Sequence, residues 1–112
     1  MHNSEMNIEL YVGSDGKSPF EEWMNGLKDL KIISKVRARL NRIRLGSFGD
    51  CKSLHEGVFE LRIDFGPGYR VYYGRHGKEI VILLCGGTKK KQSKDIKIAK
   101  EFWKDYKRRI KT

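Results

Sequence analysis

The feature that most constrains the fold is a set of three consecutive strand patterns in the middle of the chain, separated by short turns. The first two alternate apolar with polar residues, as strands with one buried face do, and Gly66-Pro67-Gly68 separates them. In the third, Ile80 to Cys85 are apolar at every position, which is typical of a strand covered on both faces. We therefore predict a mainly antiparallel sheet with this third strand in a central position, its strands spanning 58–65, 69–75 and 79–85.

The remaining patterns predict one more strand and three helices. A period-two pattern predicts a first strand at about 7–13. Ser18-Pro19-Phe20-Glu21 supplies an N-cap, a proline at the first helical position and a capping-box glutamate, so a helix begins at Pro19 and ends near Leu27. A second helix ends before Gly46 and a third spans about 93–109, each with one apolar stripe. The predicted order is β-α-α-β-β-β-α, a single α+β domain over residues 1–112 in which residues 1–6 are expected to be flexible.

Length and composition exclude several classes of protein. The 112 residues fit one domain of ordinary size. The longest apolar run, Ile80 to Cys85, is far shorter than the roughly 20 residues of a membrane-spanning helix. The first residues lack the basic and apolar segments of a secretory signal, and two isolated cysteines make no disulfide framework. We expect a soluble cytoplasmic protein without a membrane partner.

The net charge of +10 is unevenly distributed along the chain. Residues 1–30 have a net charge of −4, residues 31–49 of +6 and residues 86–112 of +8, while residues 50–85 are balanced. Segregated positive blocks indicate a polyanionic partner. Nucleic acid fits better than a membrane surface, which would require large apolar residues opposite the basic face of a helix.

Polar side chains gather on one predicted face of the sheet. Arg62, Arg70 and Tyr72 alternate with the apolar positions of their strands and therefore point to the opposite face. Glu60 and Asp64 lie nearby. Guanidinium groups can clamp phosphate, but they are permanently charged and cannot act as a general base.

A second candidate is the segment Gly86–Gln92, which leaves the central strand and runs toward the last helix. Its glycines allow close approach of the backbone, the helix end offers free N–H groups, and Lys89, Lys90 and Lys91 add charge. The segment is either a phosphate-binding turn or a solvated lysine run, and its position next to Arg70 favours the former.

Other motifs are weaker. Gly13–Ser18 lacks the spacing of a phosphate-binding P-loop and is better explained as an ordinary strand-to-helix turn. The three histidines have no metal-ligand spacing, so we predict no metal site. His55 is either a solvated loop residue or a proton shuttle. The cations of the second helix form either a solvated face or a surface that contacts a nucleic-acid backbone.

Together these segments resemble the RelE/ParE toxin superfamily, most closely its HigB-like branch of phage-derived, Gp49-like addiction module killer proteins. The resemblance implies a small sheet packed against an N-terminal helical hairpin and a C-terminal helix. It also implies a toxin that cleaves mRNA in the ribosomal A site and is paired with a helix-turn-helix antitoxin encoded next to it. The similarity covers about residues 7–106 and rests on Phe20-x-x-Trp23, Arg39-Leu40-x-Arg42, Leu45-Gly46-x-Phe48-Gly49-Asp50, Glu60 to Ile63, Gly66 to Tyr73 and Gly86 to Ile96.

The resemblance also implies roles for individual residues. Arg70 matches the arginine that RelE-type nucleases use on the scissile phosphate, and Arg62 falls where they place a basic residue on the preceding strand. Lys89 and Gln92 match a Gly-Gly-Asp-Lys-x-x-Gln segment, in which Thr88 replaces the usual Asp. The expected RNA-binding residues are Lys90, Lys91, Gln92, Lys94 and His55, and the expected antitoxin-binding residues are Arg37, Arg39 and Arg42.

RNA cleavage requires a base for the 2′-hydroxyl, stabilisation of the phosphorane and an acid for the 5′-oxygen. Arg62 and Arg70 can stabilise the charge without a metal or other cofactor. Tyr72 and Lys89 can exchange protons if neighbouring cations lower their pKa values, with His55 in reserve. The expected activity is that of a metal-independent endoribonuclease, with Arg62, Arg70, Tyr72 and Lys89 as its catalytic residues.

Two other functions stay open at this point. A ParE-like toxin has the same fold but binds and inhibits a protein target such as DNA gyrase without catalysis. A plain nucleic-acid-binding module would explain the charge, but not the arginine and tyrosine side chains gathered on one sheet face.

Overall fold

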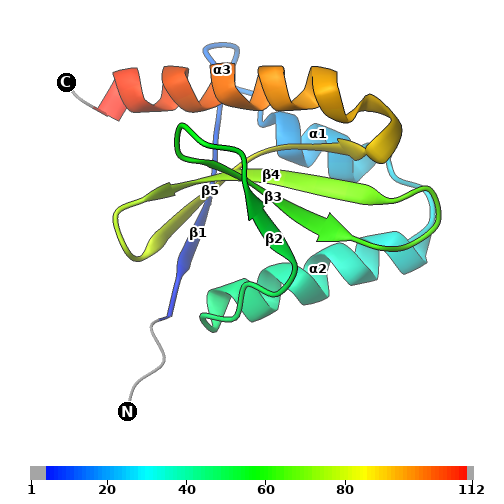
Figure 1. Cartoon of the computed structure of the whole chain (residues 1–112). Helices are drawn as coiled ribbons and strands as arrows, with labels where there is room; N and C mark the ends of the chain where they lie inside the picture. Colours follow the sequence, from blue (N-terminus) through cyan, green and yellow to red (C-terminus); the bar gives the residue numbers. More distant parts are fainter. Residues whose placement is uncertain (1–4, 111–112) are drawn as a thin grey trace.

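A computed structural model describes residues 5–110 as five strands and three α-helices (Figure 1). The chain forms one small α+β domain in which the helices cover both faces of a mixed sheet, as expected from the sequence. In chain order the elements are β1 (Asn7–Leu10), α1 (Pro19–Gly26), α2 (Leu30–Arg44), β2 (Cys51–Ser53), β3 (Val58–Ile63), β4 (Tyr69–His76), β5 (Ile80–Thr88), a 3₁₀ turn η1 (Lys89–Lys91) and α3 (Gln92–Ile110).

The strand order in the sheet is β1-β5-β4-β3-β2. Strands β2 to β5 pair antiparallel, and β1 lies parallel to β5 at one edge. The apolar strand β5 therefore has neighbours on both sides, and residues 81–85 are buried. Its predicted central position is confirmed in this sense, although β4 is the middle strand of the five.

Two cores form, one on each face of the sheet. On one face α1 and α2 pack against side chains such as Leu61, Val71 and Leu83. The other face is covered by α3 (orange to red in Figure 1). Its residues Ala99 and Trp103 pack against Val58, Tyr72 and other strand residues. The helix stripes in the sequence are the ones that become buried: Ile32, Val36 and Ile43 of α2, and Ala99 and Trp103 of α3.

Local signals define the helix ends. The Ser18 side chain accepts a hydrogen bond from the Glu21 amide at 3.2 Å, and Pro19 is the first helical residue, as predicted. Asp29 caps α2 in the same way, with the Lys31 amide 2.8 Å from its carboxylate. Gly46 follows α2 with a φ of +93°, a conformation that favours glycine.

The structure differs from the predicted strands at several points, one of which is that the strand predicted at 58–65 ends at Ile63. The first strand ends at Leu10 and not at residue 13. The short strand β2 at the sheet edge was missed, because three residues with one apolar side chain show no alternation. Strand β5 continues through Gly86, Gly87 and Thr88, which the sequence assigned to a loop.

The described part of the chain begins just before the first strand. Residues 1–4 lie outside the described part, but Met6 is a member of the core on the α2 face. Its amide donates a hydrogen bond to the Arg44 carbonyl at 2.9 Å, which joins Met6 to the end of α2. Among residues 5–110, no helix has the length and apolar character needed to cross a membrane.

Candidate functional site: a cationic pocket at the end of the sheet

Three of the four expected catalytic residues line one pocket at the end of β3 and β4. Arg62 comes from β3, Arg70 from β4 and Lys89 from η1, and the cavity has a volume of about 340 Å³. Two carboxylates, Asp50 and Asp64, and the turn Gly66–Gly68 complete its lining. The three cations thus face a space that two negative groups only partly neutralise.

The sheet register brings these cations together. Arg62 and Arg70 are direct partners in the antiparallel β3–β4 pair, so their side chains leave the same face of the sheet next to each other. The Lys89 amide donates a hydrogen bond to the Gly68 carbonyl at 2.9 Å, which fixes the lysine turn against the β3–β4 turn. Gly68 has a φ of +85°, and a β-carbon there would lie 3.4 Å from that of Lys89, so glycine permits this close approach.

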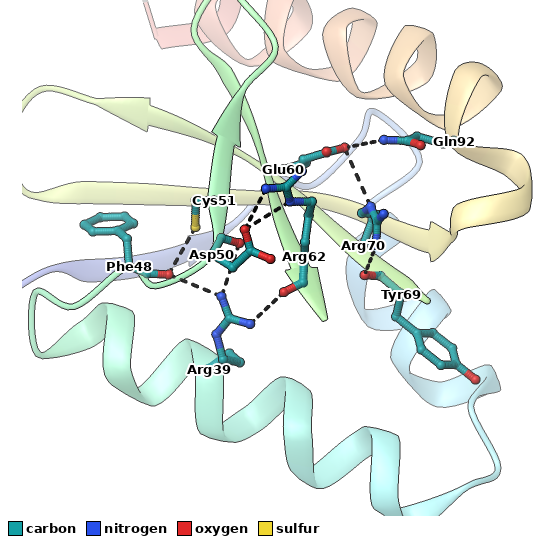
Figure 2. Close-up of polar contacts among 9 residues, drawn as sticks. All are labelled: Arg39, Phe48, Asp50, Cys51, Glu60, Arg62, Tyr69, Arg70 and Gln92. Carbon is teal, nitrogen blue, oxygen red and sulfur yellow. Dashed lines mark hydrogen bonds and ion pairs between the residues drawn. The ribbon is translucent and has the colours of Figure 1, made fainter. Parts of the chain in front are cut away.

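Arg62 forms an ion pair with Asp50, whose carboxylate oxygen accepts from Nη2 at 2.7 Å and from Nε at 3.1 Å. The hydrogen bond and charge of Asp50 raise the pKa of Arg62 above its usual value, so the guanidinium group stays charged. Arg39 of α2 supports the pair from below by donating to the carbonyls of Arg62 (2.6 Å), Asp50 (3.3 Å) and Phe48 (3.4 Å) (Figure 2).

Arg70 is held by a buried carboxylate. Glu60 on β3 is only 1% exposed and lies 4.0 Å from the Arg70 Nε, which has no hydrogen-bond partner among the described residues. The same carboxylate accepts a hydrogen bond from the Gln92 side chain at 2.8 Å (Figure 2). Arg70 also donates from Nη1 to the Tyr69 carbonyl at 3.1 Å. Glu60 therefore connects the pocket arginine on β4 with the beginning of α3.

Tyr72 does not take the place that the sequence indicated. It lies on the same sheet face as Arg70, but α3 covers it completely and its hydroxyl has no hydrogen-bond partner in the described part of the chain. Burial, assisted by the negative charges of Glu60 and Asp95, raises its pKa. A pKa lowered by cations was the condition for proton exchange by Tyr72, and it is not met; the side chain also does not line the pocket.

The lysine turn is exposed, but its glycines have a different purpose from the expected one. Gly86 and Gly87 belong to β5, where a β-carbon would overlap the Trp23 ring at the first position and the Asp95 carboxylate at the second. They permit close packing of α1 and α3 and do not form a loop around phosphate. Lys90, Lys91 and Lys94 are exposed and continue the positive charge from the pocket onto the first turn of α3.

His55 lies away from the pocket. It is in the turn between β2 and β3, next to Val58, whereas Arg62 is near the other end of β3. The neighbouring Glu56 pairs with Lys100 in the middle of α3 at 3.1 Å. The structure therefore does not bring His55 together with the expected catalytic residues.

The expected antitoxin residues divide between two sides of α2. Lys35, Arg39 and Arg42, at helical spacing, line a cavity with Ile63 and Asp64, and we call them the inner row. Arg37, Asn41 and Arg44 line a second cavity, which shares Ala38 with the first, and form the outer row. Within this set Arg37 and Arg42 are exposed, while Arg39 is half-buried and bound to backbone carbonyls.

Sequence reasoning missed the roles of Asp50, Glu60 and Arg39. Asp50 belongs to a motif that carries the family resemblance, but no alternation or helical spacing indicates its role, because it follows Gly49 in an irregular segment before β2. Glu60 did show a signal. It alternates with the apolar residues of its strand, and this places it on the sheet face that bears Arg62 and Arg70. Among residues 5–110 there is no group of three or more His, Cys, Asp or Glu side chains arranged to hold a metal ion.

Two comparisons identify relatives of this chain. Residues 22–104, which include every residue lining the cationic pocket, match the family described as phage-derived protein Gp49-like (DUF891). A Haemophilus influenzae (strain Rd) protein named "Uncharacterized protein" is 53% identical over 81 residues, which cover 72% of this chain and 82% of the relative. The chain therefore belongs to the Gp49-like family of phage-derived proteins.

Proposed function

We propose that this protein is the toxin of a type II toxin–antitoxin system and a ribosome-dependent endoribonuclease that cleaves translated mRNA. The proposal rests on one observation above all, the pocket in which Arg62, Arg70 and Lys89 from three separate elements face the same space. Membership of the Gp49-like family, which is associated with toxin–antitoxin systems, supports the toxin role. The resemblance to HigB-like members of the RelE/ParE superfamily supports the nuclease activity.

In the proposed reaction the 2′-oxygen of a ribose attacks the adjacent phosphorus, and the bond from phosphorus to the 5′-oxygen breaks. The products are a 2′,3′-cyclic phosphate and a 5′-hydroxyl, so the proton lost from the 2′-oxygen is balanced by one gained at the 5′-oxygen. Arg70 and Arg62 stabilise the additional negative charge of the phosphorane, and Glu60 and Asp50 keep the two guanidinium groups in place. Lys89 is the pocket side chain that can donate a proton to the leaving 5′-oxygen.

A toxin of this kind requires an inhibitor in its host. We propose a helix-turn-helix antitoxin that is encoded next to the toxin and binds it in the cytoplasm. The exposed cations Arg37 and Arg42 of α2 offer an acidic partner complementary charge. Co-expression with the neighbouring reading frame should restore growth and yield a complex that co-purifies. Charge reversal with Arg37→Glu and Arg42→Glu should weaken that complex, and undiminished affinity would place the antitoxin elsewhere.

The function is tested by inducing the protein in cells and mapping mRNA 5′ ends across the transcriptome. The proposal predicts new ends that keep a constant position relative to the codons of translated messages, and their absence when translation is blocked beforehand. An Arg70→Ala variant induced to the same level is the control and should leave messages intact. Growth arrest with intact messages and damaged DNA would instead support a ParE-like inhibitor of gyrase.

A further inference from the structure

The inner row of α2 lies directly beside the cationic pocket. Asp64 lines both the pocket and the inner-row cavity of about 480 Å³, so the two hollows meet at its side chain. A hydrogen bond also links the two sets of residues, because Arg39 of the inner row donates to the carbonyl of Arg62, which lines the pocket (Figure 2). The outer-row cavity shares none of the residues that line the pocket.

The joined hollow is strongly positive at both ends. Lys35, Arg39 and Arg42 are its cations on the α2 side, and the three pocket cations lie on the other. Asp50 and Asp64 are the only acidic side chains among the residues that line it, which leaves a net charge of +4. Such a continuous positive groove is the form in which proteins follow the backbone of single-stranded nucleic acid.

The Arg39 side chain is bound to backbone carbonyls, but the side chains of Lys35 and Arg42 are available to a ligand. Both side chains are exposed, and neither side chain forms a hydrogen bond or an ion pair with another residue of the described part of the chain. Lys35 does lie over the Phe65 ring, 5.2 Å from its centroid, which holds the ammonium group near the groove.

Asp64 occupies the point where the two hollows meet. Its carboxylate is exposed and has no hydrogen-bond or ion-pair partner among residues 5–110. A phosphate would be repelled there, whereas a hydroxyl group could donate a hydrogen bond to it. Along a nucleic-acid strand the ribose 2′-hydroxyl lies between successive phosphates, and this hydroxyl distinguishes RNA from DNA.

We propose that the pocket and the inner row of α2 form one track for single-stranded RNA. Phosphates bind at Arg70 and Lys89 on one side and at Lys35 and Arg42 on the other, and the Asp64 carboxylate accepts a 2′-hydroxyl between them. This inference deepens the proposed nuclease function, since the track determines how the strand reaches the pocket. It concerns binding, so it can fail or hold independently of cleavage.

The first experiment measures the affinity for a fluorescent single-stranded RNA of about ten nucleotides as a function of salt concentration. All variants are made in an Arg70→Ala background so that the RNA is not cut. In the inner-row variant Lys35→Ala/Arg42→Ala, loss of two phosphate contacts should make the slope of log affinity against log salt shallower by about 1.4. The matched control Lys31→Ala/Arg44→Ala removes the same charge from exposed positions of the same helix outside the track.

The comparison of the two double variants decides the matter. The track is supported if the control has a slope near that of the parent while the slope of the inner-row variant is shallower. Both variants must also melt at the same temperature as the parent. Equal losses in both variants would mean that RNA responds only to the overall charge, and no loss in either would mean that the strand does not pass over α2. Both results overturn the track, and neither bears on the mRNA cuts that test the nuclease.

The second experiment compares the RNA with a DNA strand of the same sequence. The parent should prefer RNA by about tenfold, the fold-change expected for one hydrogen bond to a charged group. In Asp64→Ala the DNA strand should bind more tightly because a repulsive charge is gone. The RNA strand loses its hydrogen bond at the same time and should not gain as much, so the preference for RNA should fall toward one. A preference that is absent in the parent or unchanged in Asp64→Ala would show that Asp64 does not contact the ribose.

Discussion

Arg70 is the residue on which the chemistry of the pocket depends most. It extends from the middle strand of the sheet, and the buried Glu60 carboxylate and the Tyr69 carbonyl restrict its position. We expect Arg70→Ala to lower the cleavage rate at least a hundredfold, because removing one preorganised donor to a developing charge costs about 3 kcal/mol. The measurement is the rate of ribosome-dependent mRNA cleavage, with Arg75→Ala, an exposed arginine of the same strand, as the control. Wild-type cleavage by a folded Arg70→Ala protein would refute this role.

Glu60 should contribute both to the stability of the fold and to the rate of cleavage, although it is buried. The Glu60→Gln substitution retains an acceptor for Gln92 but removes the charge beside Arg70, so we expect a loss of about 1–3 kcal/mol in the free energy of unfolding. We also expect a lower cleavage rate at saturating substrate, because Arg70 is no longer held. Denaturant unfolding and single-turnover kinetics measure the two effects. Glu56→Gln removes a carboxylate from the exposed pair with Lys100 and should change neither quantity measurably.

At the scale of residues, alternation along strands was enough to group Arg62 with Arg70. The register then places them side by side, because the Gly66-Pro67-Gly68 turn fixes how β3 and β4 pair. Tyr72 shows the limit of such reasoning. Alternation assigns a side chain to a face of the sheet, but whether a helix covers that face depends on where α3 docks, which no local pattern encodes.

At the scale of elements, the contact of Trp103 with Gly74 is one of the close contacts through which α3 packs on the sheet. Trp103 packs so tightly on Gly74 of β4 that a β-carbon there would overlap its ring. We expect Gly74→Ala to destabilise the protein by about 1–3 kcal/mol, because the ring must move and the helix must shift with it. The matched control is Gly26→Ala at the end of α1, where a β-carbon has no heavy atom within 4 Å. That change should be neutral or stabilising by up to about 1 kcal/mol, and equal melting of the two variants would disprove the contact argument.

The elements that could be predicted from the sequence are those whose patterns are long. The capping residues of α1, the apolar stripes of α2 and α3 and the apolar strand β5 each combine several consistent signals. Strand β2 could not be found because it is short and lies at the sheet edge, where few side chains need to be buried. The end of β5 could not be predicted because glycines such as Gly86 and Gly87 are typical of loops. In this strand they are required because Trp23 and Asp95 leave no room for a β-carbon.

At the scale of the whole molecule, hydrogen bonds join the segment after β1 to α3, one of them from Arg109 Nη1 to the Val12 carbonyl at 2.9 Å. The Tyr11 hydroxyl donates to the Asp105 carboxylate at 2.6 Å and connects the segment after β1 with α3. Burial and this carboxylate raise the pKa of Tyr11 to about 12, whereas an unfolded chain ionises its tyrosines near pH 10. A group whose pKa is raised by folding contributes stability below its unfolded pKa and loses it as the pH rises toward the folded value.

We therefore expect the free energy of unfolding to fall between pH 9 and pH 11, with about 1 kcal/mol of the loss due to Tyr11. Denaturant titrations at the two pH values measure the loss, and Tyr11→Phe should reduce it by that amount. At acidic pH the dependence of stability on pH has the opposite sign. Hydrogen bonding to Tyr11 lowers the pKa of Asp105, so its contribution is present at neutral pH and disappears as the carboxylate is protonated. An equal alkaline loss in the parent and in Tyr11→Phe would contradict the assignment.

The parallel pairing of β1 with β5 has a consequence for the order of events during biosynthesis. Asn7 is translated early, but its partner in the sheet is Ile80, so the first strand waits for most of the chain before it can pair. The pocket likewise needs Asp50, Arg62, Arg70 and finally Lys89. A nascent chain therefore has no assembled pocket while its own message is still being read through these codons. By this topology the proposed nuclease spares the ribosome that is making it until synthesis has passed the last of its pocket residues.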